Sequence, residues 1–248
     1  MADLVYRPLV FTVKGLFGAL GLKFDIIGQE NIPVTGGAVL AINHISFLDY
    51  AFAGLPADRV GHRRVRFMAK DGIFKHPVAG PLMRSMGHIS VNRDAGSDAF
   101  RQGVRALKDG ELLGVFPEGT MSRSFELISF KSGAVRMAAM AQVPIIPMAV
   151  FGGQRILGYG HKDLSRGKTI GVTIGKPIDV EKRADVHTET DHLKSVMGAL
   201  LDQTIERYPR NTTDDLWWLP PRFGGTAPTV EELRNKRSHS SDTSVEDE

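Results

Sequence analysis

The residues with the clearest chemical potential are His44 and Asp49, in the segment Asn-His-Ile-Ser-Phe-Leu-Asp at positions 43–49. Four residues separate them, so a turn followed by one helical turn can bring the carboxylate back to the imidazole. A carboxylate bonded to one ring nitrogen fixes the tautomer, leaves the other nitrogen free as a base and stabilises the imidazolium. The pair indicates general-base activation of a substrate hydroxyl, which then attacks a thioester carbonyl directly. The spacing also fits a purely structural role, in which Asp49 caps a helix.

A second segment with reactive groups is residues 116–124, Phe-Pro-Glu-Gly-Thr-Met-Ser-Arg-Ser, which begins at the end of an expected strand. A loop at such a position can present backbone amides, hydroxyls and the Arg123 guanidinium to an anionic or polyol ligand. Its proline, glycine, threonine and serine content is equally typical of a surface turn.

Other chemistries have weaker support in the sequence. Ser46 lacks the Gly-x-Ser-x-Gly surroundings of a nucleophile elbow, and a helix-capping position explains it. The eight histidines are scattered, without the spacing of a zinc site, so we expect no metal. The chain has no cysteine, which excludes disulfides, thiolate nucleophiles and Cys-ligated metals.

Apolar runs bounded by turn signals predict the elements that position these residues. Strands are expected over 38–42, 65–70, 88–92, 112–116, 144–150 and 168–174, and helices from 46 toward 54 and over 97–108, 132–142 and 191–208. The alternation of strands and helices predicts an α/β fold. Asn43 and His44 then lie at a strand-to-helix turn, with Ser46 as the N-cap and Asp49 completing a capping box.

The bulk composition is that of a folded domain: of 248 residues, 42% are hydrophobic and 24% are charged. The net charge is +3, and Arg63, Arg64 and Arg66 lie close together. Such a patch suits an anionic lipid or cofactor, and a solvated loop is the alternative. The basic residues are not interleaved with aromatics as in nucleic-acid-binding modules, so we expect no nucleic-acid partner.

The two ends of the chain carry possible membrane signals. Residues 4–24 are apolar at near-helical spacing, but Arg7, Lys14 and Lys23 interrupt them, so we expect a helical segment at the membrane interface rather than a spanning helix. Packing on the domain is the alternative. Near the other end, Trp217 and Trp218 adjoin prolines and an arginine, which suits either a membrane interface or the cap of a core edge.

Four ordered blocks, taken together, resemble the glycerolipid acyltransferase family that includes the bacterial 1-acylglycerol-3-phosphate acyltransferases. The blocks cover about residues 39–150, nearly half the chain. They are Asn43, His44 and Asp49; residues 67–70 with residues 91–93; the Phe-Pro-Glu-Gly-Thr of residues 116–120; and the proline-centred apolar residues 143–147.

The resemblance implies a role for each residue of the site. His44 would be the general base and Asp49 its orienting partner. Arg93, and with it Lys70, would hold the acceptor phosphate, since guanidinium binds phosphate oxygens in a bidentate fork. The third block implies that Glu118, Gly119 and Thr120 help to bind the glycerol phosphate. Many members have arginine at the next position, where this chain has Met121, so Arg123 or Lys131 would have to replace that contact.

The resemblance also implies the reaction. A fatty acyl chain, its tail in an apolar groove, moves from an acyl-CoA or acyl carrier protein thioester to 1-acylglycerol 3-phosphate, giving phosphatidate, with no permanently bound cofactor. We expect backbone amides near His44 to hold the oxyanion. Glycerol 3-phosphate or a glycolipid is the alternative acceptor, and a noncatalytic lipid-binding relative is the rival class.

The expected architecture is a mixed sheet flanked by helices, as in glycerol-3-phosphate acyltransferases, peripheral or monotopic on the cytoplasmic face of the cell membrane. Its expected parts are an interfacial helical segment over 1–30, the acyltransferase domain over 31–210, a Trp/Pro segment over 211–233 and a disordered tail over 234–248.

Overall fold

A seven-stranded sheet forms the centre of the molecule in the computed structural model, which describes residues 2–77, 79–92, 96–210 and 215–235. The strand order is β1-β9-β6-β2-β5-β3-β4, and only β6 and β9 pair antiparallel within this described sheet. The strands are β1 (Lys23–Ile27), β2 (Ala38–Ile42), β3 (Val65–Lys70), β4 (Ile89–Val91), β5 (Leu112–Val115), β6 (Ile145–Phe151) and β9 (Thr169–Ile174). The predicted α/β class is confirmed.

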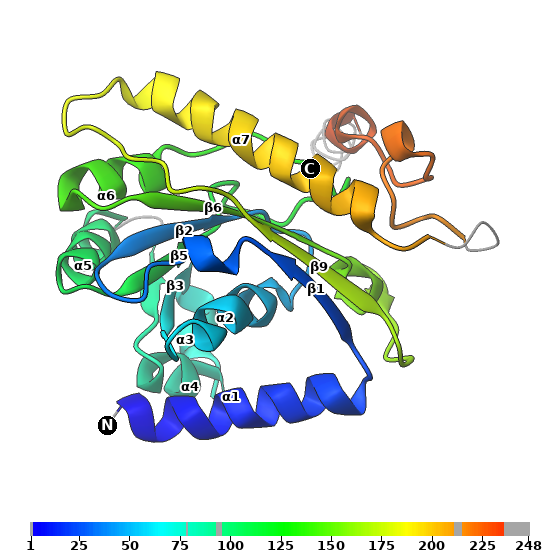
Figure 1. Cartoon of the computed structure of the whole chain (residues 1–248), viewed down its shortest axis with the longest axis horizontal. Coiled ribbons are helices and arrows are strands. Elements are labelled where there is room, and N and C mark those ends of the chain that lie inside the picture. Colours follow the sequence, from blue (N-terminus) through cyan, green and yellow to red (C-terminus); the bar gives the residue numbers. More distant parts are fainter. Residues whose placement is uncertain (1, 78, 93–95, 211–214, 236–248) are drawn as a thin grey trace, which may run out of the picture.

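Helices cover both faces of the sheet: in Figure 1, α6 and α7 lie above it and α1 and α2 below it. A short hairpin, β7 (Leu157–Gly158) with β8 (His161–Lys162), follows β6. The helices are α1 (Ala2–Ala19), α2 (Asp49–Arg59), α3 (Asp71–Lys75), α4 (Ala79–Ser85), α5 (Gly96–Lys108), α6 (Gly133–Ala141) and α7 (Val186–Arg207), with 3-10 turns η1 (Gln29–Asn31), η2 (Gly153–Arg155) and η3 (Pro221–Phe223).

The side chains of β2 alternate between two cores, one on each face of the sheet. Leu40 and Ile42 pack in the cluster that includes Phe17 of α1 and Phe52 of α2. Val39 and Ala41 pack in the cluster formed with α5, α6 and α7. Because successive side chains of a strand point to opposite faces, a continuous apolar run such as residues 38–42 identifies a strand buried on both sides.

The C-terminal segment packs against the domain through its tryptophans. Trp218 is 1% exposed and lies with Phe151 of β6, Ile205 of α7 and Tyr208 in a third apolar cluster. Trp218 therefore fits the interpretation of this segment as the cap of a core edge, and not as a membrane interface. Of the tail expected to be disordered, over 234–248, only residues 234 and 235 are described, and both are helical.

Three elements differ most from the sequence prediction, of which α7 begins at Val186 instead of residue 191. Strand β1 lies within residues 1–30, which the apolar pattern assigned to an interfacial helical segment, and it pairs with β9 at the edge of the sheet. Helix α2 begins at Asp49 and continues past Gly54 to Arg59, so Ser46 is not its N-cap. The Asp49 carboxylate accepts the Ser46 amide, which is only one half of the predicted capping box.

Candidate active site

The turn after β2 is fixed by a buried asparagine. The Asn43 side chain donates to the carbonyl of Val150 at 3.0 Å and accepts from the amide of the same residue at 2.7 Å. Asn43 is fully buried. This two-way bond joins the end of β2 to β6, so the next residue, His44, leaves the sheet from a rigid position at the carboxyl ends of parallel strands.

Asp49 lies beside the His44 ring, as its spacing predicted. One carboxylate oxygen of Asp49, Oδ2, is 3.0 Å from His44 Nδ1 and also accepts the backbone amides of Ile45 at 2.7 Å and Ser46 at 2.8 Å. Asp49 is fully buried, and this burial raises its pKa, while the bonds from His44, Ser46 and Ile45 act in the opposite direction. The first helical residue of α2 thus holds both the ring and the turn that carries it.

The imidazole of His44 stands in an aromatic setting. Its ring stacks on Phe116 at a centroid distance of 4.3 Å and meets Tyr50 edge-on at 5.8 Å. Its side chain is 13% exposed and lines a cleft. With Nδ1–H donating to Asp49, Nε2 is the nitrogen that can accept a proton from a bound hydroxyl. Sequence reasoning missed Tyr50 as a neighbour, because an aromatic residue at that helical position is typical of an ordinary core contact.

Glu118 reaches the same turn from the end of β5. Its Oε1 accepts the backbone amide of His44 at 2.9 Å, and its Oε2 accepts the amide of Ile128 at 3.0 Å. Burial raises the pKa of Glu118 to about 7; the nearby Asp49 carboxylate adds to the rise, whereas the two amides and Lys194 lower it. The structure therefore brings together His44, Asp49 and Glu118.

The cleft beside His44 has a volume of about 510 Å³ and combines cations with apolar walls. Lys70, Gly119, Thr120 and Lys131 line it. Gly119 has φ +66° and lies so close to the Lys131 side chain that an added Cβ would be 2.9 Å from its Cε atom. Its apolar lining includes Val91, Phe100, Ala134 and Met137. Such a cleft can accept an anionic head group attached to an apolar chain.

The structure describes only one of the two arginines expected at the site. Arg93 lies outside the described residues. Arg123 is exposed, and its guanidinium stacks over the Tyr159 ring at 4.3 Å, at the edge of the cleft that Tyr159 lines. Met121, which stands where many members of the resembling family have arginine, is buried and lines the cleft. Tyr159 was not foreseen, because the two-residue strands of its hairpin are too short to leave a pattern.

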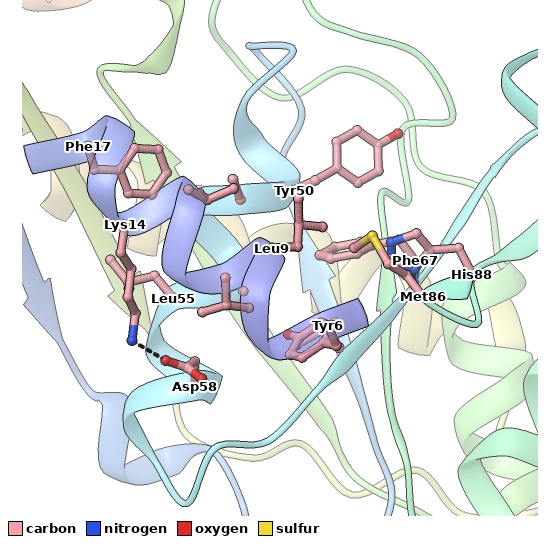
Figure 2. A pocket seen from close by; sticks show the side chains of 15 residues that line it. Tyr6, Leu9, Lys14, Phe17, Tyr50, Leu55, Asp58, Phe67, Met86 and His88 are labelled. Atoms are coloured by element: carbon pink, nitrogen blue, oxygen red, sulfur yellow. Dashed lines mark hydrogen bonds and ion pairs between the residues drawn. The ribbon is translucent and has the colours of Figure 1, made fainter. Parts of the chain in front are cut away.

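A separate apolar cavity of about 160 Å³ lies between α1 and α2. Figure 2 shows Leu9 of α1 facing a wall that includes Phe67 and His88, with the Lys14–Asp58 ion pair to one side. Tyr50 lines both this cavity and the cleft of His44. Tyr50 is therefore a wall that the apolar cavity shares with the cleft of His44.

Comparison with known proteins gives a consistent picture. A family profile described as "Acyltransferase" matches residues 23–151, slightly more than half of the chain. A chloroplastic 1-acyl-sn-glycerol-3-phosphate acyltransferase from Arabidopsis thaliana is 36% identical over 169 residues, covering 66% of this chain and 46% of the relative. The chain thus spans about half the length of that relative. A 1-acyl-sn-glycerol-3-phosphate acyltransferase from Bacillus subtilis is 28% identical over 193 residues, covering 77% of this chain and 90% of the relative.

The fold also has a solved counterpart. The crystal structure of the 1-acyl-sn-glycerophosphate acyltransferase PlsC from Thermotoga maritima aligns with a TM-score of 0.70 at 22% identity. The alignment covers 84% of this chain and 83% of that one. The predicted mixed sheet flanked by helices is therefore an architecture already observed in a solved structure.

Proposed function

Because the chain belongs to the acyltransferase family, we propose that it transfers a fatty acyl group from a thioester donor to the free hydroxyl of 1-acylglycerol 3-phosphate. The observation that carries the proposal is the His44–Asp49 pair, bonded at 3.0 Å and opening onto a cleft lined by Lys70 and Lys131. The names of the Arabidopsis and Bacillus relatives support the choice of acceptor.

The reaction follows from the free ring nitrogen. His44 Nε2 accepts the proton of the acceptor hydroxyl while its oxygen forms a bond to the thioester carbon. Asp49 stabilises the resulting imidazolium through Nδ1. The tetrahedral intermediate then expels the thiolate, which takes the proton back from Nε2. The products are an ester and a free thiol, of either coenzyme A or acyl carrier protein, and the histidine returns to its neutral form.

The oxyanion of that intermediate requires donors other than those expected from the sequence. The backbone amides of Ile45 and Ser46 donate to Asp49, and the amide of His44 donates to Glu118. These three groups are already used by carboxylates. The Gly119 amide is used as well, because it donates to the carbonyl of Phe116 at 3.0 Å. We therefore place oxyanion stabilisation at Thr120, with Lys131 adding positive charge, since both residues line the same cleft.

The two lysines of the cleft suit the acceptor phosphate. Lys70, the last residue of β3, and Lys131, in the loop before α6, line one cleft, and their ammonium groups can bind the phosphate oxygens as point charges. The position of Met121 favours a second acceptor class, because an uncharged side chain lines the cleft there. A glycolipid acceptor without phosphate, or glycerol 3-phosphate, is therefore the alternative to be assayed.

Apolar spaces on both sides of Tyr50 suit acyl chains. We place the tail of the donor in the cavity between α1 and α2, because that space is apolar and shares the Tyr50 wall with the cleft of His44. Each methylene transferred from water into such a space contributes about 0.8 kcal/mol. The cavity thereby gives the enzyme a means of binding the donor by its chain.

Association with a lipid surface is proposed through α1. The inner face of this helix packs Phe17 into the core, whereas Phe11 is 79% and Leu16 55% exposed on its outer side. Exposed apolar residues beside Arg7 suit an anionic interface, whereas Lys14 is already paired with Asp58. In the described part of the chain, no helix is long and apolar enough to cross a bilayer. Sedimentation with anionic vesicles should fall when Phe11 and Leu16 are both replaced by serine.

The decisive experiment is an acyl-transfer assay with labelled acyl-CoA and acyl carrier protein donors. The acceptor panel comprises 1-acylglycerol 3-phosphate, glycerol 3-phosphate and lysoglycolipids, with products identified by mass. His44→Ala should reduce transfer at least about 1,000-fold in a folded protein, while the exposed-histidine control His187→Ala retains it. Substantial activity in His44→Ala would refute the mechanism, and a preferred acceptor without phosphate would replace the proposed substrate.

A further inference from the structure

His44 is held through its backbone as well as through its ring. Its amide donates to Glu118 Oε1 at 2.9 Å, and its carbonyl accepts the amide of Ser122 at 2.7 Å. Both polar groups of the histidine backbone are therefore bonded to the segment 118–122, while Asp49 binds the ring from α2. The position of the imidazole relative to the cleft depends on that segment as much as on Asp49.

Glu118 extends the connection to a further part of the chain. Its second oxygen accepts the amide of Ile128 at 3.0 Å, so one carboxylate bridges the turn after β2 and the loop that precedes α6. The residue is only 4% exposed. Hydrogen bonds from neutral amides to a carboxylate are stronger than those between neutral groups, and both oxygens of Glu118 are directed at protein backbone.

A buried carboxylate is also poorly suited to contact a phosphate. Two anions repel each other most strongly where water is excluded, and Asp49 already places a second carboxylate near this point. The cations that line the cleft, Lys70 and Lys131, suit a phosphate far better. The sequence resemblance, by contrast, implies that Glu118 helps to bind the glycerol phosphate.

We propose that Glu118 is a positioning residue, which holds the His44 backbone so that Nε2 meets the acceptor hydroxyl, and that it makes no contact with the acceptor. The inference rests on the proposed acyl transfer by His44. Misplacing a reactive group by about 1 Å can cost about 100-fold in rate. Loss of the Glu118 bonds to the His44 and Ile128 amides should therefore lower kcat and leave the KM for the acceptor nearly unchanged.

The test compares three variants in the acyl-transfer assay. Glu118→Gln keeps the side-chain volume, but its NH₂ group cannot accept the second of the two amides. We expect its kcat to fall about 100-fold, with the acceptor KM within about threefold of wild type. Lys70→Met, which removes a cation of the cleft assigned only to the acceptor phosphate, should instead raise the acceptor KM. Glu126→Gln is the matched control, because this glutamate is in the same loop and pairs with Arg222 outside the cleft.

Hydrogen exchange at the His44 amide provides a readout that does not depend on activity. Exchange should be at least about tenfold faster in Glu118→Ala, which removes both acceptor oxygens, than in wild type, and unchanged in Glu126→Gln. If wild type transfers no acyl group, the proposed function fails, and the exchange rates still decide whether Glu118 holds His44. If Glu118→Gln does not fold, Glu118→Asp, whose shorter side chain cannot span both amides, takes its place. A raised acceptor KM with unchanged kcat, or equal exchange rates, would overturn the inference.

Discussion

Replacing His88 with glutamine should make the protein more resistant to mild acid. His88 precedes β4, and its Nδ1 accepts the backbone amide of Phe67 at 3.0 Å, so a proton on that nitrogen would face another donor. Burial lowers the pKa of His88 to about 4, and the positive charges of Arg66 and Arg64 add to the shift. The folded protein therefore opposes protonation of this ring, whereas the unfolded chain does not.

The size of the effect follows from proton linkage. Histidine in an unfolded chain has a pKa of about 6.5, so the unfolded state binds a proton at this residue between pH 7 and pH 5. In the folded protein His88 binds that proton only near pH 4. Stability from His88 is thus present above pH 6.5 and is lost as the pH falls toward 4. The linkage relation gives a loss of about 2 kcal/mol in unfolding free energy between pH 7 and pH 5. Glutamine cannot take up that proton.

Urea unfolding at the two pH values measures this difference, with the fluorescence of Trp217 and Trp218 as the probe. The quantity to compare is the change from pH 7 to pH 5 in each protein, because other groups, including Glu118 with its raised pKa, contribute equally to both. His88→Gln should lose about 2 kcal/mol less than wild type. His192→Gln, at an exposed site on α7, is the control. Equal losses in wild type and His88→Gln would refute the argument.

Three further predictions concern the catalytic pair, the cavity and the C-terminal segment. Asp49→Asn keeps an oxygen for His44 Nδ1 but removes the charge that stabilises imidazolium, so kcat should fall about 100-fold or more in steady-state assays while the fold is retained by circular dichroism. Gly54→Leu should shift preference toward shorter acyl donors, and Gly54→Ala should do so less, because Gly54 lines the cavity and has no neighbour within 4 Å of an added Cβ. Trp218→Ala should lower the unfolding free energy in urea by about 3–5 kcal/mol, since the ring is buried.

The strands that position the site were predictable because their signal is local. Residues 38–42 form an unbroken apolar run after a glycine turn, and β2 has those bounds. Strand β1 was not predictable in the same way. It is an edge strand of five residues whose partner, β9, lies far away in the sequence, with Lys23 paired to Thr169. Nothing near Lys23 indicates that pairing, and the preceding helical pattern masks it.

The residues of the site likewise include some that a local sequence pattern predicts and some that only the structure shows. Residue types and spacing predicted His44 beside Asp49, because two side chains five positions apart leave a signature in the sequence. The contact of Glu118 with His44 leaves none, since the carboxylate binds a backbone amide that every residue except proline possesses. Its second bond, to the amide of Ile128, is hidden for the same reason. Sequence could indicate that Glu118 matters, while only the structure indicates what it touches.

The register of β2 and β5 explains why two segments 74 residues apart meet at one histidine. Ala41 pairs with Val115 in the parallel ladder. Three residues further along each chain stand His44 and Glu118, so the two segments leave the sheet in step and bond directly. A slip of one residue in this pairing would exchange the buried faces of β2 and separate the carboxylate from the His44 amide. The chemistry of the site is therefore tied to the packing of the sheet, because the same register buries Leu40 on one face and Val39 on the other.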